Sequence, residues 1–169
     1  MASARDIQLA KQVGEYLVAA ELSRRGFQCA TFSGNVPDYD IAAVDATGRH
    51  IPVQVKAIRT GSWQFDARRY FEIRLSGKKQ AVGDLLHSPI PGLICVLVKL
   101  AAYGTDEFYL LKWTELQALH AENYGAMLKK HHGVRTKAPS STHTIVTPRQ
   151  VAAFRDNWDI IATGRVPGA

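Results

Sequence analysis

The feature that most limits the fold is an almost unbroken apolar run, GLICVLVKL, at Gly92–Leu100. The run is far shorter than the roughly 20 apolar residues that a membrane span needs. It is typical of a strand buried in the middle of a sheet, which needs neighbouring strands and covering helices. The chain of 169 residues is long enough for one packed domain of this kind. The run therefore favours a layered α/β domain.

The segments before and after this run supply the other elements. A helix is predicted over Arg5–Arg25, with Ser3 as its N-cap and Gly26 as the glycine that ends it. Its apolar residues fall into two stripes, which predicts burial on two sides. One stripe consists of Ala10, Val13, Leu17 and Ala20, and the other of Ile7, Val18 and Leu22. Further strands are predicted at Phe27–Phe32, Tyr39–Asp45, Ile51–Ile58 and Phe108–Lys112.

The remaining segments are predicted from weaker patterns. Trp63–Leu75 is expected to form a fourth strand or a hairpin, and a short helix is expected over Lys78–Leu86. Two more helices are predicted to begin at Thr114 and at Thr147-Pro148, where Thr suits the N-cap and Pro the first helical position. The order α-β-β-β-(β)-α-β-β-α predicts an α/β domain with a mixed sheet.

Two of the predicted strands flank the turn Ala46–Gly48, whose glycine suits the left-handed position of a three-residue hairpin loop. Centring the hairpin on the middle residue of this loop pairs Asp45 with Arg49. Counting outwards from that pair sets Asp40 directly opposite Gln54. The register thus predicts a carboxylate and an amide side by side on neighbouring strands.

Lys56 follows Gln54 by two residues, so both side chains are expected on one face of the strand. The opposite face carries the apolar residues Ile41, Ala43, Val53 and Val55. Carboxylate and amide oxygens are ligands that Mg²⁺ accepts, and an ammonium can neutralise charge on a reacting phosphate. The alternative is a surface ion pair between Lys56 and Asp40, which contributes about 0–1 kcal/mol.

The stretches GEYLVAAELSRRGF, PDYDIAAVD and IPVQVKAIR occur in this order between Gly14 and Arg59. Together they resemble the PD-(D/E)XK nuclease superfamily, in particular its Q-x-K variants and its restriction-endonuclease-like and Holliday-junction-resolvase-like members. The resemblance implies an α/β fold with a restriction-endonuclease-like αβββαβ core, in which helices flank a mixed β-sheet. It also implies hydrolysis of phosphodiester bonds in duplex or branched DNA with Mg²⁺ or Mn²⁺. Many relatives act as dimers, so a homodimer is expected.

The resemblance also implies a role for each matching residue. Asp40 and Gln54 would hold the metal, Lys56 would be the catalytic lysine, and Glu15 on the first helix would add a further ligand. Asp38 is the alternative to Asp40, because the letters PD of the family pattern fall on it. The alternative for Glu15 is an ion pair with the lysine four residues earlier, Lys11.

Gln54 stands where an acidic residue is commoner in this superfamily. A neutral ligand removes one negative charge and is expected to weaken metal binding. The first alternative function is therefore a catalytically weak nucleic-acid-binding module on the same fold. The second is a basic protein-interaction or immunity-type protein that binds a partner through the polar face of its sheet.

The charge of the chain agrees with a nucleic-acid partner. Lys and Arg number 21 against 15 Asp and Glu, a formal net charge of +6, which favours contact with polyanions. The pairs Lys78-Lys79 and Lys129-Lys130 are predicted to bind nucleic acid, with a solvated surface as the alternative. The sequence alone leaves open whether these pairs share a face.

The whole chain, residues 1–169, is interpreted as a single nuclease-like domain. Its core is expected at about residues 4–112, followed by a C-terminal helical extension at about 113–169. The N-terminal residues MASARDIQLAKQ lack the apolar segment of a signal peptide. A cytoplasmic protein without a membrane partner is therefore expected.

Overall fold

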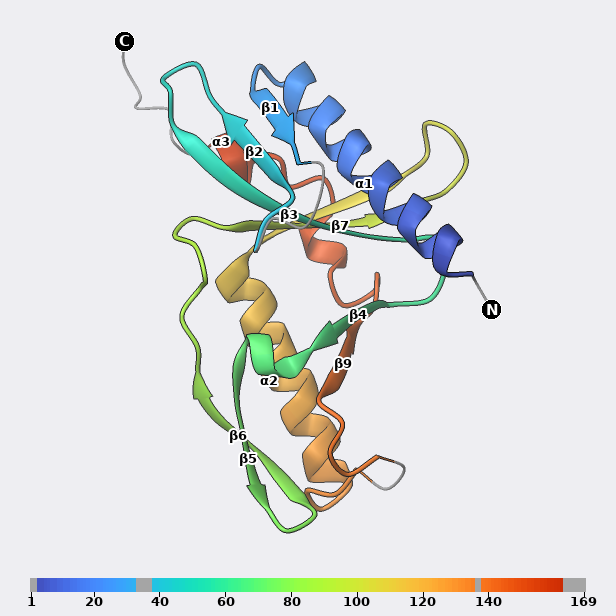
Figure 1. The fold of residues 1–169 in the computed structure, drawn as a ribbon, viewed down its shortest axis with the longest axis vertical. Coiled ribbons are helices and arrows are strands. Elements are labelled where there is room, and N and C mark those ends of the chain that lie inside the picture. The colour runs from blue at the N-terminus through green and yellow to red at the C-terminus, as the bar shows by residue number, and fades with distance from the viewer. Residues whose placement is uncertain (1–2, 33–37, 136–137, 163–169) are drawn as a thin grey trace. The chain divides into compact units, whose positions relative to one another are not determined.

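A computed structural model describes residues 3–32, 38–135 and 138–162 of the chain (Figure 1). The chain divides into two compact units, each drawn from separate stretches of sequence. Unit 1 comprises Met1–Trp63, Pro89–Trp113 and Thr147–Ala169, and unit 2 comprises Gln64–Ser88 and Thr114–Val146. The interpretation of the whole chain as a single nuclease-like domain stays a prediction.

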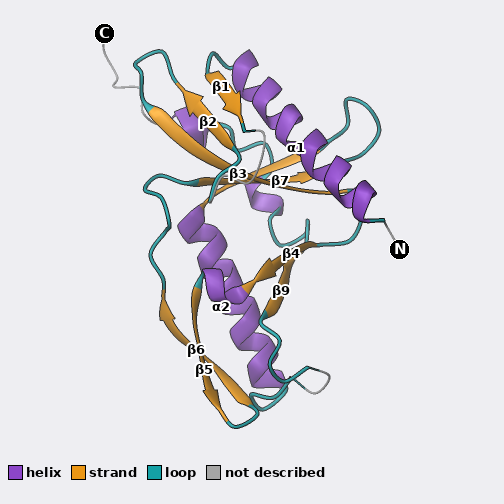
Figure 2. Ribbon diagram, in the orientation of Figure 1, coloured by secondary structure: helices purple, strands orange, loops and turns teal. Residues whose placement is uncertain are grey.

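Unit 1 contains a five-stranded sheet in the order β1-β2-β3-β7-β8. Figure 2 labels β1, β2, β3 and β7 of this sheet. Strands β3 and β7 are parallel, whereas the other neighbours are antiparallel, so the sheet is mixed as predicted. The apolar run supplies β7, an inner strand that is buried from Ile94 to Val98. The strand bounds are β1 Gln28–Thr31, β2 Ile41–Val44, β3 His50–Ile58, β7 Ile94–Lys99 and β8 Glu107–Lys112.

Helix α1, Ala4–Arg24, packs against this sheet. It begins with a capping box in which Ser3 and Asp6 each accept a backbone hydrogen bond from the other, and it ends before Gly26, whose φ is 89°. Both ends are as predicted. The predicted burial on two sides is wrong, because Val13 of one apolar stripe is 38% exposed. The residues of α1 that are buried form one face: Ala10, Gly14, Val18 and Leu22.

The apolar core of unit 1 lies between α1 and the sheet. Alternate residues of the inner strands enter this core, and they include Ile41, Ala43, Val53, Val55, Ile94, Val96 and Val98. Gln54 and Lys56 alternate with these residues, so they face away from the core. On that other face the indole of Trp63 donates to the carbonyl of Val98 and packs edge-on against Tyr109.

Unit 2 is built around helix α2, Trp113–Lys130. Beside it are two pairs of strands, β5 Phe71–Ser76 with β6 Lys79–Leu85, and β4 Trp63–Asp66 with β9 His143–Val146. The predicted strand or hairpin over Trp63–Leu75 is thus β4, a short 3-10 helix and β5, which pair with different partners.

The helix predicted over Lys78–Leu86 is wrong, because this segment is strand β6. Gly77, with φ of 60°, is the first central residue of a two-residue turn between Ser76 and Lys79. A glycine at that position is typical of the tight hairpin turn that matches the twist of two strands. In the order of the sequence, β4, β5 and β6 therefore come between β3 and β7, where a helix was expected. The fold class, α/β with a mixed sheet flanked by helices, is confirmed.

The helix predicted from Thr147-Pro148 is also wrong. The chain instead forms a 3-10 helix at Ala152–Phe154 and the short helix α3, Asp159–Ala162. Asp156 takes φ of 52°, and its N–H donates to the carbonyl of Phe108 in β8 at 2.8 Å. This contact with the sheet interrupts the helical path that the local sequence favours. Within the described ranges, no helix is both long and apolar enough to cross a membrane.

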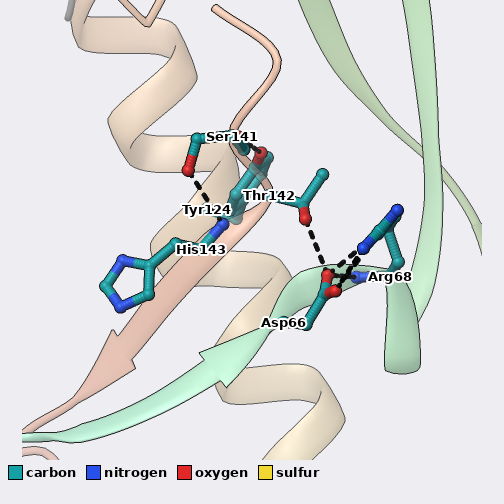
Figure 3. Close-up of polar contacts among 6 residues, drawn as sticks. All are labelled: Asp66, Arg68, Tyr124, Ser141, Thr142 and His143. Carbon is teal, nitrogen blue, oxygen red and sulfur yellow. Dashed lines mark hydrogen bonds and ion pairs between the residues drawn. The ribbon is translucent and has the colours of Figure 1, made fainter. Parts of the chain in front are cut away.

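Asp66 joins the end of β4 to the segment before β9 within unit 2 (Figure 3). Its carboxylate accepts hydrogen bonds from the guanidinium and the backbone N–H of Arg68 and, at 2.7 Å, from the hydroxyl of Thr142. The hydrogen bond from the Arg68 guanidinium, and after it those from Thr142 and from the Arg68 N–H, lower the pKa of Asp66 from 3.8 to about 2, although burial acts in the opposite direction. The ionised carboxylate is therefore stabilised by the fold.

Asp66→Asn is expected to lower the free energy of unfolding at neutral pH by about 1 kcal/mol, a value reduced by the screening of a partly exposed carboxylate. The folded pKa lies below the unfolded one, so this stabilisation is complete above about pH 4 and disappears as the pH falls through about 2. Urea unfolding of both proteins at neutral pH and near pH 2 measures the effect. Asp84→Asn, which breaks an exposed ion pair with Arg74, is the control. A difference of equal size at both pH values would contradict the assignment.

Candidate functional site

The β2–β3 hairpin has the predicted register. It pairs Ile41 with Val53, and its loop contains Gly48 with φ of 83°. Regular pairing ends at this residue pair, because the N–H of Asp40 also donates to the carbonyl of Val53, at 2.9 Å. Asp40 therefore lies where β2 leaves the sheet, next to the position predicted for it opposite Gln54.

The side chain of Asp40 takes the place of a backbone hydrogen-bond acceptor for β3 at this point. In a regular ladder the N–H of Val55 would bond to the carbonyl of Tyr39, but Oδ2 of Asp40 accepts it instead, at 2.8 Å. Nε2 of Gln54 donates to the carbonyl of Asp38 at 3.3 Å, and Asp38 has φ of 76°, a left-handed conformation in which Asp is enriched. Two polar side chains thus hold the chain where the strands separate.

Glu15 of α1 meets Asp40 around one ammonium group. Nζ of Lys11 lies 3.6 Å from Oε1 of Glu15 and 3.7 Å from Oδ1 of Asp40. The two carboxylate side chains are only 13% and 19% exposed. Burial raises the pKa of Glu15, repulsion from Asp40 raises it further, and Lys11 acts in the opposite direction. Glu15 therefore forms the ion pair with Lys11 that was one of its two alternatives, and the same ammonium lies beside Asp40. Its role as a metal ligand stays a prediction.

Gly14 allows α1 to approach the sheet at this place. It is buried against β3, and a Cβ atom built on it would lie 2.5 Å from the Cβ of Ala57 and 3.6 Å from a methyl of Val55. The first distance is far below van der Waals contact, so the close approach requires a residue without a side chain. An isolated glycine inside a helical sequence signals such packing, so the role of Gly14 could be predicted from the sequence.

The predicted ligands suit a hard divalent cation. Mg²⁺ binds proteins through one or two carboxylates, and water and substrate phosphate supply its other oxygen ligands. The ammonium of Lys11 already occupies a place between Glu15 and Asp40 where positive charge is stabilised. Among the residues that the structure describes, no group of three or more His, Cys, Asp and Glu side chains could hold a metal ion. A cation here would therefore depend on two carboxylates, the amide of Gln54, and water or substrate.

The other predicted residues are placed as follows. Gln54 and Lys56 are half-buried and flank Val55, the residue whose N–H binds Asp40. The lysines predicted to bind nucleic acid belong to unit 2. Lys78 is in the β5–β6 turn, Lys79 begins β6, and Lys129 and Lys130 end α2.

Comparison with known proteins gives a fold and no family. A scan against protein-family models found no match, and neither did a search of curated proteins. The fold is similar to the solved structure of a bacterial homing endonuclease, I-Ssp6803I, with a TM-score of 0.51. The similarity covers 92% of this chain and 93% of that chain at 15% sequence identity, so it shows the fold alone. The chain therefore has an endonuclease-like α/β fold.

Proposed function

We propose that this chain is a divalent-metal-dependent nuclease of the PD-(D/E)XK type that hydrolyses phosphodiester bonds in DNA. The observation that carries the proposal is the meeting of Glu15 and Asp40 around one ammonium, at the place where β2 leaves β3. Gln54 lies at the same place, because its amide nitrogen donates to the carbonyl of Asp38. Together with Lys56 it forms the Q-x-K pattern of the sequence. The endonuclease-like fold and the net charge of +6 support DNA as the substrate.

Each residue has a separate task in this proposal. Mg²⁺ or Mn²⁺ held by Glu15, Asp40 and Gln54 would supply positive charge to the scissile phosphate. Oδ2 of Asp40 stays with the Val55 N–H, which leaves Oδ1, the atom that faces Lys11, as the ligand. The ammonium of Lys56 neutralises charge that develops in the transition state and orients the attacking water.

Asp40→Asn is the sharpest test of the metal site, because Asn keeps an oxygen for the Val55 N–H and removes the negative charge. We expect the Mn²⁺ affinity measured by calorimetry to fall roughly tenfold or more. Metal-dependent cleavage of duplex, branched and single-stranded DNA is expected to be lost with it. Asp84→Asn, the same chemical change at an exposed ion pair in unit 2, should leave both quantities unchanged. Equal Mn²⁺ affinity in wild type and Asp40→Asn would reject the site.

A second candidate is a nucleic-acid-binding module on the same fold that does not cut. Gln54 favours it, because this neutral residue replaces the commoner acid and its amide nitrogen is bound to the Asp38 carbonyl. A wild-type protein that binds the three DNA substrates and cuts none of them with Mg²⁺ or Mn²⁺ would establish this candidate instead.

The predicted homodimer is a separate proposal. Cutting both strands of a duplex needs two sites, which a homodimer would provide. Light scattering can test whether the protein is a dimer.

A further inference from the structure

Two basic segments that lie far apart in the sequence meet at one end of unit 2. Lys78 and Lys79 are in the turn between β5 and β6, while Lys129 and Lys130 form the last turn of α2. All four side chains are exposed. We call these four lysines, together with the exposed His131 and His132 that follow them, the basic tip of unit 2.

Gly133 connects the two segments. Its carbonyl accepts the N–H of Gln80 at 2.8 Å, and Val134 forms an antiparallel bridge with Lys79. The N–H of Gly133 donates to the carbonyl of Leu128 in α2 at 2.8 Å. Gly133 has φ of 82°, and a Cβ atom at this position would lie 3.3 Å from the carbonyl oxygen of Gln80. The hairpin and the end of the helix are therefore joined through backbone contacts that favour a glycine.

The side chain of Gln80 fixes the hairpin more firmly against the rest of unit 2. It is 4% exposed, and its Oε1 accepts the hydroxyl hydrogen bond of Tyr124 in α2. Its Nε2 donates to the carbonyls of Pro139 and Ser141. A buried amide that is hydrogen-bonded at both ends holds its strand in one place. The four lysines are thus presented on a pre-organised scaffold.

The charge of the tip is not balanced by its own segments. Residues 73–83 and 123–135 contain no Asp or Glu, whereas Arg74 has Asp84 beside it at 2.8 Å at the far end of β6. Several like charges on one surface attract a polyanion and raise its local concentration. Exposed lysines are compact positive charges that contact phosphates without reading bases. The chemistry of the tip therefore fits a phosphate backbone.

We propose that the basic tip binds the phosphate backbone of duplex DNA, and that this binding is separable from cleavage. The choice of DNA over other polyanions rests on the proposed function. The carboxylate cluster of Glu15 and Asp40 belongs to unit 1, and the tip belongs to unit 2. Loss of the cluster therefore leaves the tip's contribution to DNA binding intact.

The test measures binding of a labelled DNA duplex by fluorescence anisotropy in EDTA, so that nothing is cut, over a series of salt concentrations. The tip variant is K78Q/K79Q/K129Q/K130Q. The control variant removes the same charge from exposed arginines of unit 1: R5Q/R24Q/R149Q/R155Q. Each phosphate contact contributes about 0.9 to the slope of log K against log salt. We expect the tip variant to lose a slope of about 2–4 and at least roughly tenfold in affinity at moderate salt.

The outcomes are distinguishable from failure of the nuclease proposal. Asp40→Asn, which tests the metal site, should keep the wild-type affinity and slope even if no protein cuts DNA. If the tip variant does not fold, K78Q/K130Q is expected to lose about half of the slope change. Equal slopes for wild type, tip variant and control would overturn the proposal. So would tip-dependent binding to vesicles with anionic lipid, or to duplex RNA, in the absence of binding to DNA.

Discussion

Lys56→Ala reduces the rate of DNA cleavage by about two orders of magnitude or more and leaves DNA affinity within about threefold of wild type, if the proposed role is correct. The amine acts mainly on charge that appears in the transition state, so its loss slows the reaction more than it weakens binding. The side chain faces away from the apolar core under α1, so the truncation leaves that core packed as before. Single-turnover cleavage and anisotropy on the same duplex separate the two effects.

Lys56→Arg is the matched variant, because it keeps the charge and changes its shape. A guanidinium is larger, spreads its charge and cannot lose a proton at working pH, so it replaces a compact amine poorly. We expect it to cut about as slowly as Lys56→Ala. Cleavage by Lys56→Ala at the wild-type rate would remove Lys56 from the catalytic site. If Lys56→Arg cut at the wild-type rate while Lys56→Ala did not, residue 56 would act only through its positive charge, without transferring a proton or orienting water.

Gly14→Ala should destabilise the protein although alanine is the better helix former. The new methyl would lie 2.5 Å from the Cβ of Ala57, so α1 has to move away from β3. Overpacking of this kind costs about 1–3 kcal/mol, offset by up to about 1 kcal/mol of helix propensity. A net loss of about 1–2 kcal/mol lowers Tm by roughly 2–8 °C in a chain of this size. Because Glu15 moves with the helix, Mn²⁺ affinity is expected to fall as well.

The chain offers both a rescue and a control for this substitution. Gly14→Ala combined with Ala57→Gly returns a methyl group to the same contact from the other side, and we expect it to recover much of the lost Tm and Mn²⁺ affinity. Gly125→Ala places a methyl in α2 where nothing lies within 4 Å, and it should raise stability by about 0.5–1 kcal/mol. Differential scanning calorimetry of the three proteins measures these changes. A Gly14→Ala protein that is as stable as Gly125→Ala would show that the close approach does not exist.

The elements that the sequence predicts correctly are those with strong local signals. The apolar run predicts β7. The N-cap Ser3 predicts the start of α1, and Gly26 predicts its end. The hairpin loop centred on Thr47 gives the register of β2 and β3, and with it the side of the strand that carries Gln54. In each of these segments the local preference and the tertiary contacts agree.

The errors arise where distant contacts decide the structure. The segment after Gly77 has a mixed pattern, and its strand conformation depends on pairing with β5 and on the buried contacts of Gln80. The helix expected after Pro148 yields to the backbone contact of Asp156 with Phe108. The sequence spacing predicted the ion pair of Glu15 with Lys11, but it could not show that Lys11 also reaches Asp40, because only the packing of α1 on the sheet brings them together.

The parallel pairing of β3 with β7 also determines the order in which the chain can fold during synthesis. Strand β3 emerges from the ribosome well before β7, since β4, β5 and β6 are made between them. Until Ile94–Lys99 is available, one edge of β3 has no strand to pair with, and bare edges promote aggregation. Unit 2 cannot form before residues 114–146 have been made, and the core of unit 1 is incomplete until Trp158 and Ile161 have been made. Neither unit can complete its packing until these late segments of the chain have been made.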